Sequence, residues 1–83
     1  MKQIKTMFTI WGWDQEWEGY SDFIMAFNKE KEAVDFARDC WVDSEKSRAY
    51  RVYAERTITV DGKRIGGVNG TCIKEYRRKM QGA

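Results

Sequence analysis

The segment NKEKEAVDFARDCWVDSE, residues 28–45, has the period of an amphipathic helix. At about 100° per residue, its apolar side chains share one arc of about 160°. These side chains are Ala33, Val34, Phe36, Ala37, Cys40 and Trp41. Val42 falls on the charged arc, so we expect it to be exposed, and Asn28 is suited to cap the first turn. We therefore predict a helix over residues 29–45 that packs by one face.

Two segments before this helix alternate with a period of two. Residues 2–13 (KQIKTMFTIWGW) are rich in β-branched and aromatic side chains and form the first predicted strand. Residues 14–19 (DQEWEG) are polar, end in glycine and suit a hairpin loop. Residues 20–27 (YSDFIMAF) form the second strand, and strict alternation places Phe23, Met25 and Phe27 on one face. We expect these two strands to pair antiparallel.

The segment after the helix predicts a second hairpin. Residues 49–60 (AYRVYAERTITV) form the longest strand, and Arg56 interrupts its apolar face, which indicates a bulge or a sheet edge. The dipeptide Asp61–Gly62 is a strong turn signal, after which residues 63–67 return as a short strand. The Gly-rich run that follows predicts a flexible connection. It lacks the pattern of a phosphate-binding loop, so we favour a plain turn there. For residues 71–80, a short helix that starts at Thr71 and a last strand remain alternatives.

Together these elements predict an α+β fold, with residues 1–83 as a single domain. A chain of 83 residues is too short for two cores, and it has no proline or low-complexity linker. The expected architecture is an antiparallel sheet of about four strands in the order β-β-α-β-β, with the amphipathic helix on one face. A domain of this size buries little more than ~60% of its unfolded surface. We therefore expect some of its twelve aromatic side chains to complete their burial against a partner.

The composition excludes several kinds of catalysis. The chain has no histidine, which removes Ser-His-Asp and Cys-His catalysis and His-ligated zinc or haem. Its two cysteines, Cys40 and Cys72, cannot build a zinc cage, and the sequence leaves open whether they form a disulfide. Cys40 lies on the apolar arc and is expected to pack as a small hydrophobe. We predict no catalytic residue, no metal and no cofactor, and we do not expect an enzyme.

Long apolar runs are missing from the sequence. The first residues lack the apolar stretch of about 7–15 residues that marks a signal peptide. No segment approaches the ~18 apolar residues of a membrane span. We therefore expect a cytoplasmic protein of a bacterial host, without a membrane partner.

The net charge of +2 conceals a strong asymmetry. Residues 1–45 carry ten acidic and five basic side chains, a net charge of −5. Residues 46–83 carry ten basic and three acidic side chains, a net charge of +7. Such a division indicates a contact directed by charge, within the chain or with a partner.

The first hairpin combines aromatic and acidic residues. Aromatic anchors inside a polar rim are typical of protein interfaces, and spaced carboxylates suit basic groups on a partner. The predicted protein-binding residues are Trp13, Asp14, Glu16, Trp17, Glu18 and Tyr20. We expect Trp17 to stay exposed, because Glu16 and Glu18 flank it. The alternative is that Trp11 or Trp13 packs beneath the hairpin while the acids merely solvate a loop.

The basic half offers a second candidate, a nucleic-acid-binding surface. Clustered basic side chains bind phosphates with an affinity that depends on salt. The residues concerned are Lys63, Arg64, Lys74, Arg77, Arg78 and Lys79. The alternative is that they solvate the surface or pair with the acidic half, since the pI of 8.6 is low for a dedicated nucleic-acid binder.

In size and build, the chain resembles the small accessory proteins of bacteriophages and mobile elements, including anti-CRISPR proteins. The features that prompt this are the hairpin ending at Asn28, the helix KEKEAVDFARDCW and the hairpin ITV-DG-KRI. The resemblance implies an inhibitor that occludes a host nucleic-acid-handling protein, so our first hypothesis is a non-enzymatic protein of this kind acting through the acidic-aromatic hairpin. The second is direct nucleic-acid binding, and the third is a self-associating module, such as a homodimer in which acidic and basic halves meet.

Overall fold

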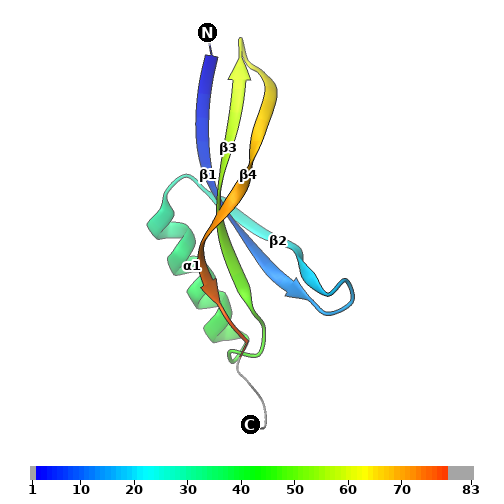
Figure 1. Cartoon of the computed structure of the whole chain (residues 1–83). Helices are drawn as coiled ribbons and strands as arrows, with labels where there is room; N and C mark the ends of the chain where they lie inside the picture. Colours follow the sequence, from blue (N-terminus) through cyan, green and yellow to red (C-terminus); the bar gives the residue numbers. More distant parts are fainter. Residues whose placement is uncertain (1, 79–83) are drawn as a thin grey trace.

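The computed structural model describes residues 2–78, and for residues 64–69 it describes the backbone alone. The elements are β1 (Lys2–Asp14), β2 (Gly19–Phe27), α1 (Glu30–Asp43), β3 (Tyr50–Val60) and β4 (Lys63–Tyr76). The strands form one antiparallel sheet in the order β2-β1-β3-β4, and α1 packs against one face of it (Figure 1). This confirms the predicted α+β fold with its β-β-α-β-β order.

The core lies between α1 and the two central strands. Ile10 of β1 pairs with Val52 of β3, and both side chains are fully buried. Ala33 and Ala37 of α1 are also fully buried, and their small side chains let the helix approach the sheet closely. Partly buried apolar side chains surround this centre; they are Phe8, Ile24, Phe27, Phe36, Cys40, Trp41 and Tyr76. The helical arc and the strand alternation therefore meet as the sequence predicts.

Two hydrogen bonds attach α1 to the end of β4. The Tyr76 hydroxyl donates to the backbone carbonyl of Val34 (3.3 Å), and the Trp41 indole N–H donates to the carbonyl of Arg77 (2.7 Å). The rings of Trp41 and Tyr76 also lie 5.5 Å apart. The far edge strand is thus held to the helix as well as to the sheet.

The sheet is longer than the helix that covers it. Strand β2 pairs only with Phe8–Asp14 of β1, whereas the first part of β1 pairs with β3 alone. The first part of β1, the end of β3 and the start of β4 therefore extend together beyond α1 (Figure 1). In this part of the sheet Ile4 is 61% exposed, although it shares a strand and a face with buried Ile10.

Both hairpin turns lie where the sequence predicts them. Asp61 and Gly62 have φ angles of 51° and 82°, the left-handed pair that a two-residue β-turn requires. The first loop spans residues 15–18. The irregularity predicted at Arg56 is confirmed as a shift in the β3–β4 register between Ala54 and Arg56. Val42 is 50% exposed, also as predicted.

Three predictions about the elements are wrong. Helix α1 covers residues 30–43, and its N-cap is Lys29 in place of Asn28, without a side-chain cap bond. Strand β4 runs through the Gly-rich segment to Tyr76, so the predicted flexible connection is wrong. Of the two alternatives for residues 71–80, the strand is the one observed over residues 71–76. The pairing partners in β3 explain this, because an isolated ten-residue helix is marginal whereas a paired strand satisfies its backbone.

Phe23 is the third correction. The β1–β2 register shifts between Ile10 and Trp11, so that Ile10 faces Met25 whereas Trp11 faces Phe23. Ile24, the extra residue, packs against the core, and Phe23 is 51% exposed. Strict alternation placed Phe23 with Met25 and Phe27, but the bulge moves it to the other face.

The pair Ile10 and Ile4 gives a direct test of the core. We expect Ile10→Ala to lower the free energy of unfolding by about 2–5 kcal/mol, because it leaves a cavity at a fully buried site. The matched change Ile4→Ala, on the same strand and face, should alter it by no more than about 0.5 kcal/mol. Urea denaturation followed by circular dichroism measures both values, and similar losses in the two variants would contradict the described core.

Candidate functional site

The tip of the β1–β2 hairpin is a well-defined turn. A carboxylate oxygen of Asp14 accepts hydrogen bonds from the backbone N–H of Glu16 (2.8 Å) and of Trp17 (3.4 Å). Glu18 has a φ of 51°, which reverses the chain before β2 begins. Asp14 thereby orders the tip, as a short carboxylate often does in turns.

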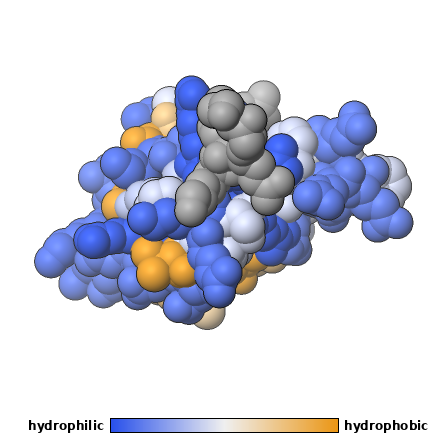
Figure 2. All heavy atoms as spheres, turned by 90° about the horizontal axis from the view of Figure 1, so that it is seen from below, coloured by the Kyte–Doolittle hydropathy of each residue, from blue (hydrophilic) through white to orange (hydrophobic). Residues whose placement is uncertain are grey.

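Trp17 stands at this tip and is 76% exposed, which confirms the prediction that it stays exposed. Glu16 and Glu18 on either side of it are exposed as well. Figure 2 shows the hairpin at the right of the view as a mostly hydrophilic projection from the body of the molecule. The tip therefore presents a large indole surface between two carboxylates.

Arg48 fixes the base of the same hairpin. Its guanidinium donates to the carbonyl of Trp13 (2.9 Å) and to the carboxylate of Asp22 (2.6 Å). It crosses directly over Gly12, where a Cβ would lie 2.8 Å from the guanidinium carbon. A glycine at position 12 is therefore what lets one arginine bridge both strands of the hairpin.

Trp13 and Tyr20 lie away from the tip, on the sheet face opposite α1, which is called the open face below. Their rings meet edge to face at 5.3 Å and 80°. The guanidinium of Arg51 lies 4.0 Å from the centre of the Tyr20 ring, and that of Arg78 lies 5.4 Å from the Trp13 ring. The structure therefore divides the predicted protein-binding residues between the tip and the open face.

A charged network borders the open face at β4. Arg51 donates to Glu75 (2.6 Å) and to the hydroxyl of Tyr53 (3.2 Å), and Arg77 donates to the other oxygen of Glu75 (2.8 Å). The hydrogen bonds from Arg51 and Arg77 lower the pKa of Glu75 below its ordinary value. Burial, and then the charge of Glu75, raises the pKa of Tyr20. Arg51 is thus committed to partners inside the chain.

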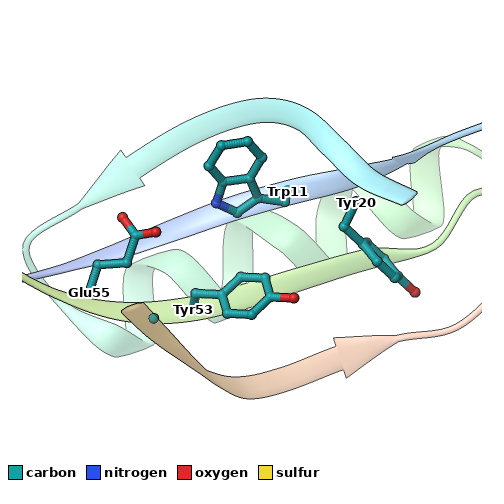
Figure 3. A pocket seen from close by; sticks show the side chains of 5 residues that line it. Trp11, Tyr20, Tyr53 and Glu55 are labelled. Atoms are coloured by element: carbon teal, nitrogen blue, oxygen red, sulfur yellow. The ribbon is translucent and has the colours of Figure 1, made fainter. Parts of the chain in front are cut away.

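A hollow of about 220 Å³ lies beside this network. It is lined by Trp11, Tyr20, Tyr53, Glu55 and Gly70, so that all four strands contribute (Figure 3). Of these residues, only Tyr20 is among the protein-binding residues predicted from the sequence. Alternation does place Tyr53 and Glu55 on one face of their strand, but their proximity to Trp11 depends on strand order and register, which local sequence does not reveal.

The predicted basic residues do not form one cluster. Lys63 begins β4 and Lys74 lies near its end, roughly 35 Å away along an extended strand. Lys74 lies 5.4 Å from the ring of Tyr76, whereas Arg77 and Arg78 lie beside Glu75 and Trp13. The side chain of Arg64 and the whole of Lys79 are outside the described part of the chain.

Chemically reactive groups are few in the described residues. They include no group of three or more His, Cys, Asp or Glu side chains that could hold a metal ion. Cys40 and Cys72 are free thiols. Burial, with the nearby Asp43 and Asp39, raises the pKa of Cys40 and keeps its thiol protonated. Within residues 2–78, no helix has the length and apolar character needed to cross a membrane.

No family model, no curated protein and no solved structure gave a significant match to this chain. Its function must therefore be argued from its own residues.

The network around Glu75 predicts a specific pH dependence. Because its pKa is lower in the folded chain than the ordinary value of 4.5, Glu75 contributes stability above that pH and loses the contribution as the pH falls through the lowered value. We expect the unfolding free energy of Glu75→Gln to fall less steeply than that of the wild type below pH 4.5. Urea titrations at a series of pH values measure this slope. Glu16→Gln at the exposed tip is the control and should keep the wild-type slope; a wild-type slope in Glu75→Gln would refute the role of the network.

Proposed function

We propose that the chain is a non-enzymatic binding protein whose contact with its partner is made by the tip of the β1–β2 hairpin. The observation that carries this is the exposure of Trp17, at 76%, on a turn that Asp14 holds in place. Tryptophan is among the residues most enriched in binding hot spots, where it fills a pocket on the partner. A turn that is ordered before binding loses little conformational entropy on association.

The charge of the tip indicates the kind of surface it fits. Asp14, Glu16 and Glu18 surround Trp17 within five residues of sequence, and no basic residue interrupts them. A basic surface with an apolar pocket complements this arrangement and would also accelerate association. The partner we propose is therefore a protein with a basic groove.

The charge asymmetry between the two halves supports an external partner. Three ion pairs are found among the described residues, and two of them, Arg51–Glu75 and Arg77–Glu75, lie within the basic half. Arg48–Asp22 is the pair that joins the two halves. Most acidic groups of the first half are thus not neutralised by the second half in the described structure.

We further propose that the partner is a protein that handles nucleic acids. Basic grooves are typical of proteins that handle nucleic acids. An acidic tip with an aromatic anchor would occupy such a groove and exclude the nucleic acid. This, together with the resemblance in size and build to anti-CRISPR proteins, supports an inhibitor of a bacterial nucleic-acid-handling protein.

The test is affinity capture from a bacterial lysate with matched double variants. Trp17→Ala/Glu18→Ala removes one apolar and one acidic side chain from the tip. Val42→Ala/Asp39→Ala removes the same kinds of exposed side chain from α1 and is the control. We expect the first pair to reduce recovery of a captured protein at least tenfold, since loss of a hot spot costs about 2 kcal/mol or more, and the control pair to retain it.

Circular dichroism must show that both double variants are folded. Equal recovery by the tip variant and the wild type would overturn the proposal. Capture that disappears after nuclease treatment would favour direct nucleic-acid binding through the basic residues. A concentration-dependent dimer without any captured protein would favour self-association.

A further inference from the structure

The hollow on the open face is built from groups that suit a cation. Figure 3 shows the rings of Trp11 and Tyr53 on opposite sides of it, with Glu55 at one end and Tyr20 at the other. Aromatic faces attract cations through the ring quadrupole, and tryptophan and tyrosine do so most strongly. A carboxylate beside such rings adds a full negative charge.

Gly70 keeps the hollow open. A Cβ at this position would lie 2.9 Å from the Cγ of Glu55 and 3.0 Å from the Cβ of Tyr53. The β3–β4 register shifts between Ala54 and Arg56, so Glu55 lies at the irregularity opposite this glycine. Bulges of this kind re-aim side chains and are frequent next to binding sites.

The walls are held in place without a ligand. The indole N–H of Trp11 donates to the hydroxyl of Thr9 (3.1 Å), and its ring meets Phe23 edge to face at 5.3 Å. The hydroxyl of Tyr53 accepts from Arg51. A ligand would therefore meet rings whose orientation is already set, which lowers the entropic cost of binding.

The charge of the hollow excludes an anion. Arg51, the basic group beside it, is paired with Glu75 and stacked on Tyr20. The carboxylate of Glu55, in contrast, makes no hydrogen bond or ion pair with the other described side chains. A phosphate or carboxylate ligand would meet this negative charge, and no unpaired cation among the described lining residues would offset it.

We propose that this hollow binds a quaternary ammonium group. Its volume is below the range of about 300–1,000 Å³ for sites that enclose whole drug-sized ligands, so it suits a head group. A primary ammonium is strongly hydrated through its three N–H donors, and contact with the aromatic walls would replace part of that hydration with poor acceptors. A quaternary ammonium has no N–H to satisfy. Trp17 does not line the hollow, so a test of this site is independent of the test of the proposed protein contact.

Choline and its neutral isostere, 3,3-dimethylbutan-1-ol, test the proposal directly. Both are titrated at constant ionic strength into the Trp17→Phe variant, which lacks the indole N–H of the exposed hairpin tip. The indole N–H resonance of Trp11 is followed by NMR. We expect choline to shift this resonance and to bind roughly fivefold or more tightly than the isostere, because only choline is charged. Equal binding of the two, or no shift at choline concentrations above about 10 mM, tenfold beyond a millimolar Kd, would overturn the proposal.

Two variants show whether the effect comes from this site. Glu55→Gln should weaken choline at least severalfold and leave the isostere unchanged, whereas Gly70→Ala should weaken both, since its methyl group enters the hollow. Glu32→Gln, at an exposed position of α1 on the other side of the sheet, is the control for charge and should change neither. Undiminished choline binding by folded Glu55→Gln would refute the assignment even if Gly70→Ala does not fold.

A quaternary ammonium can come from a small molecule or from a trimethylated lysine of a protein. A short peptide with trimethyllysine and its unmethylated form distinguish these sources. Binding of the methylated peptide at least tenfold tighter than choline, with loss on removal of the methyl groups, assigns the site to a modified protein segment. Equal binding of choline and the methylated peptide supports the small-molecule source.

Discussion

The structure depends on one contact, the burial of the Ile10–Val52 pair beneath Ala33 and Ala37. It joins the two central strands to the only helix found in residues 2–78, and it sets which face of the sheet that helix covers. In a strand, neighbouring side chains point to opposite faces. Once Ile10 and Val52 face the helix, Trp11, Arg51 and Tyr53 must face the other way. The open face is therefore a direct consequence of the core.

The aromatic side chains of the open face are stabilised by one another and by arginines. Trp11 meets Phe23, Trp13 meets Tyr20, and Arg51 stacks on Tyr20. Edge-to-face ring pairs and stacked guanidinium groups each add about 0.5–1.5 kcal/mol beyond simple burial. These contacts let a sheet with a single covering helix keep large apolar side chains on its uncovered face. They also leave a hollow where no ring fills the space above Gly70.

The hairpin tip is a separate device. Its geometry depends on Asp14 within the turn and on Arg48 at the base, which reaches across from the segment between α1 and β3. Arg48 belongs to the basic half of the sequence and Asp22 to the acidic half. This ion pair neutralises only one acidic side chain of the first half. The carboxylates of Glu16 and Glu18 beside Trp17 take part in none of the ion pairs found among the described residues.

The sequence by itself determined the helical arc, the turn at Asp61–Gly62, the irregularity at Arg56 and the exposure of Trp17, because each follows from periodicity or from the chemistry of a few adjacent residues. It did not reveal that β4 continues through its glycines, since the backbone partners of that strand come from β3, distant in sequence at most positions. The bulge that turns Phe23 outward and the meeting of Trp11, Tyr53, Glu55 and Gly70 were decided by the tertiary structure alone. The physical reason is that strand order and register are set by long-range pairing around a shared core, and a shift of one residue moves a side chain to the opposite face.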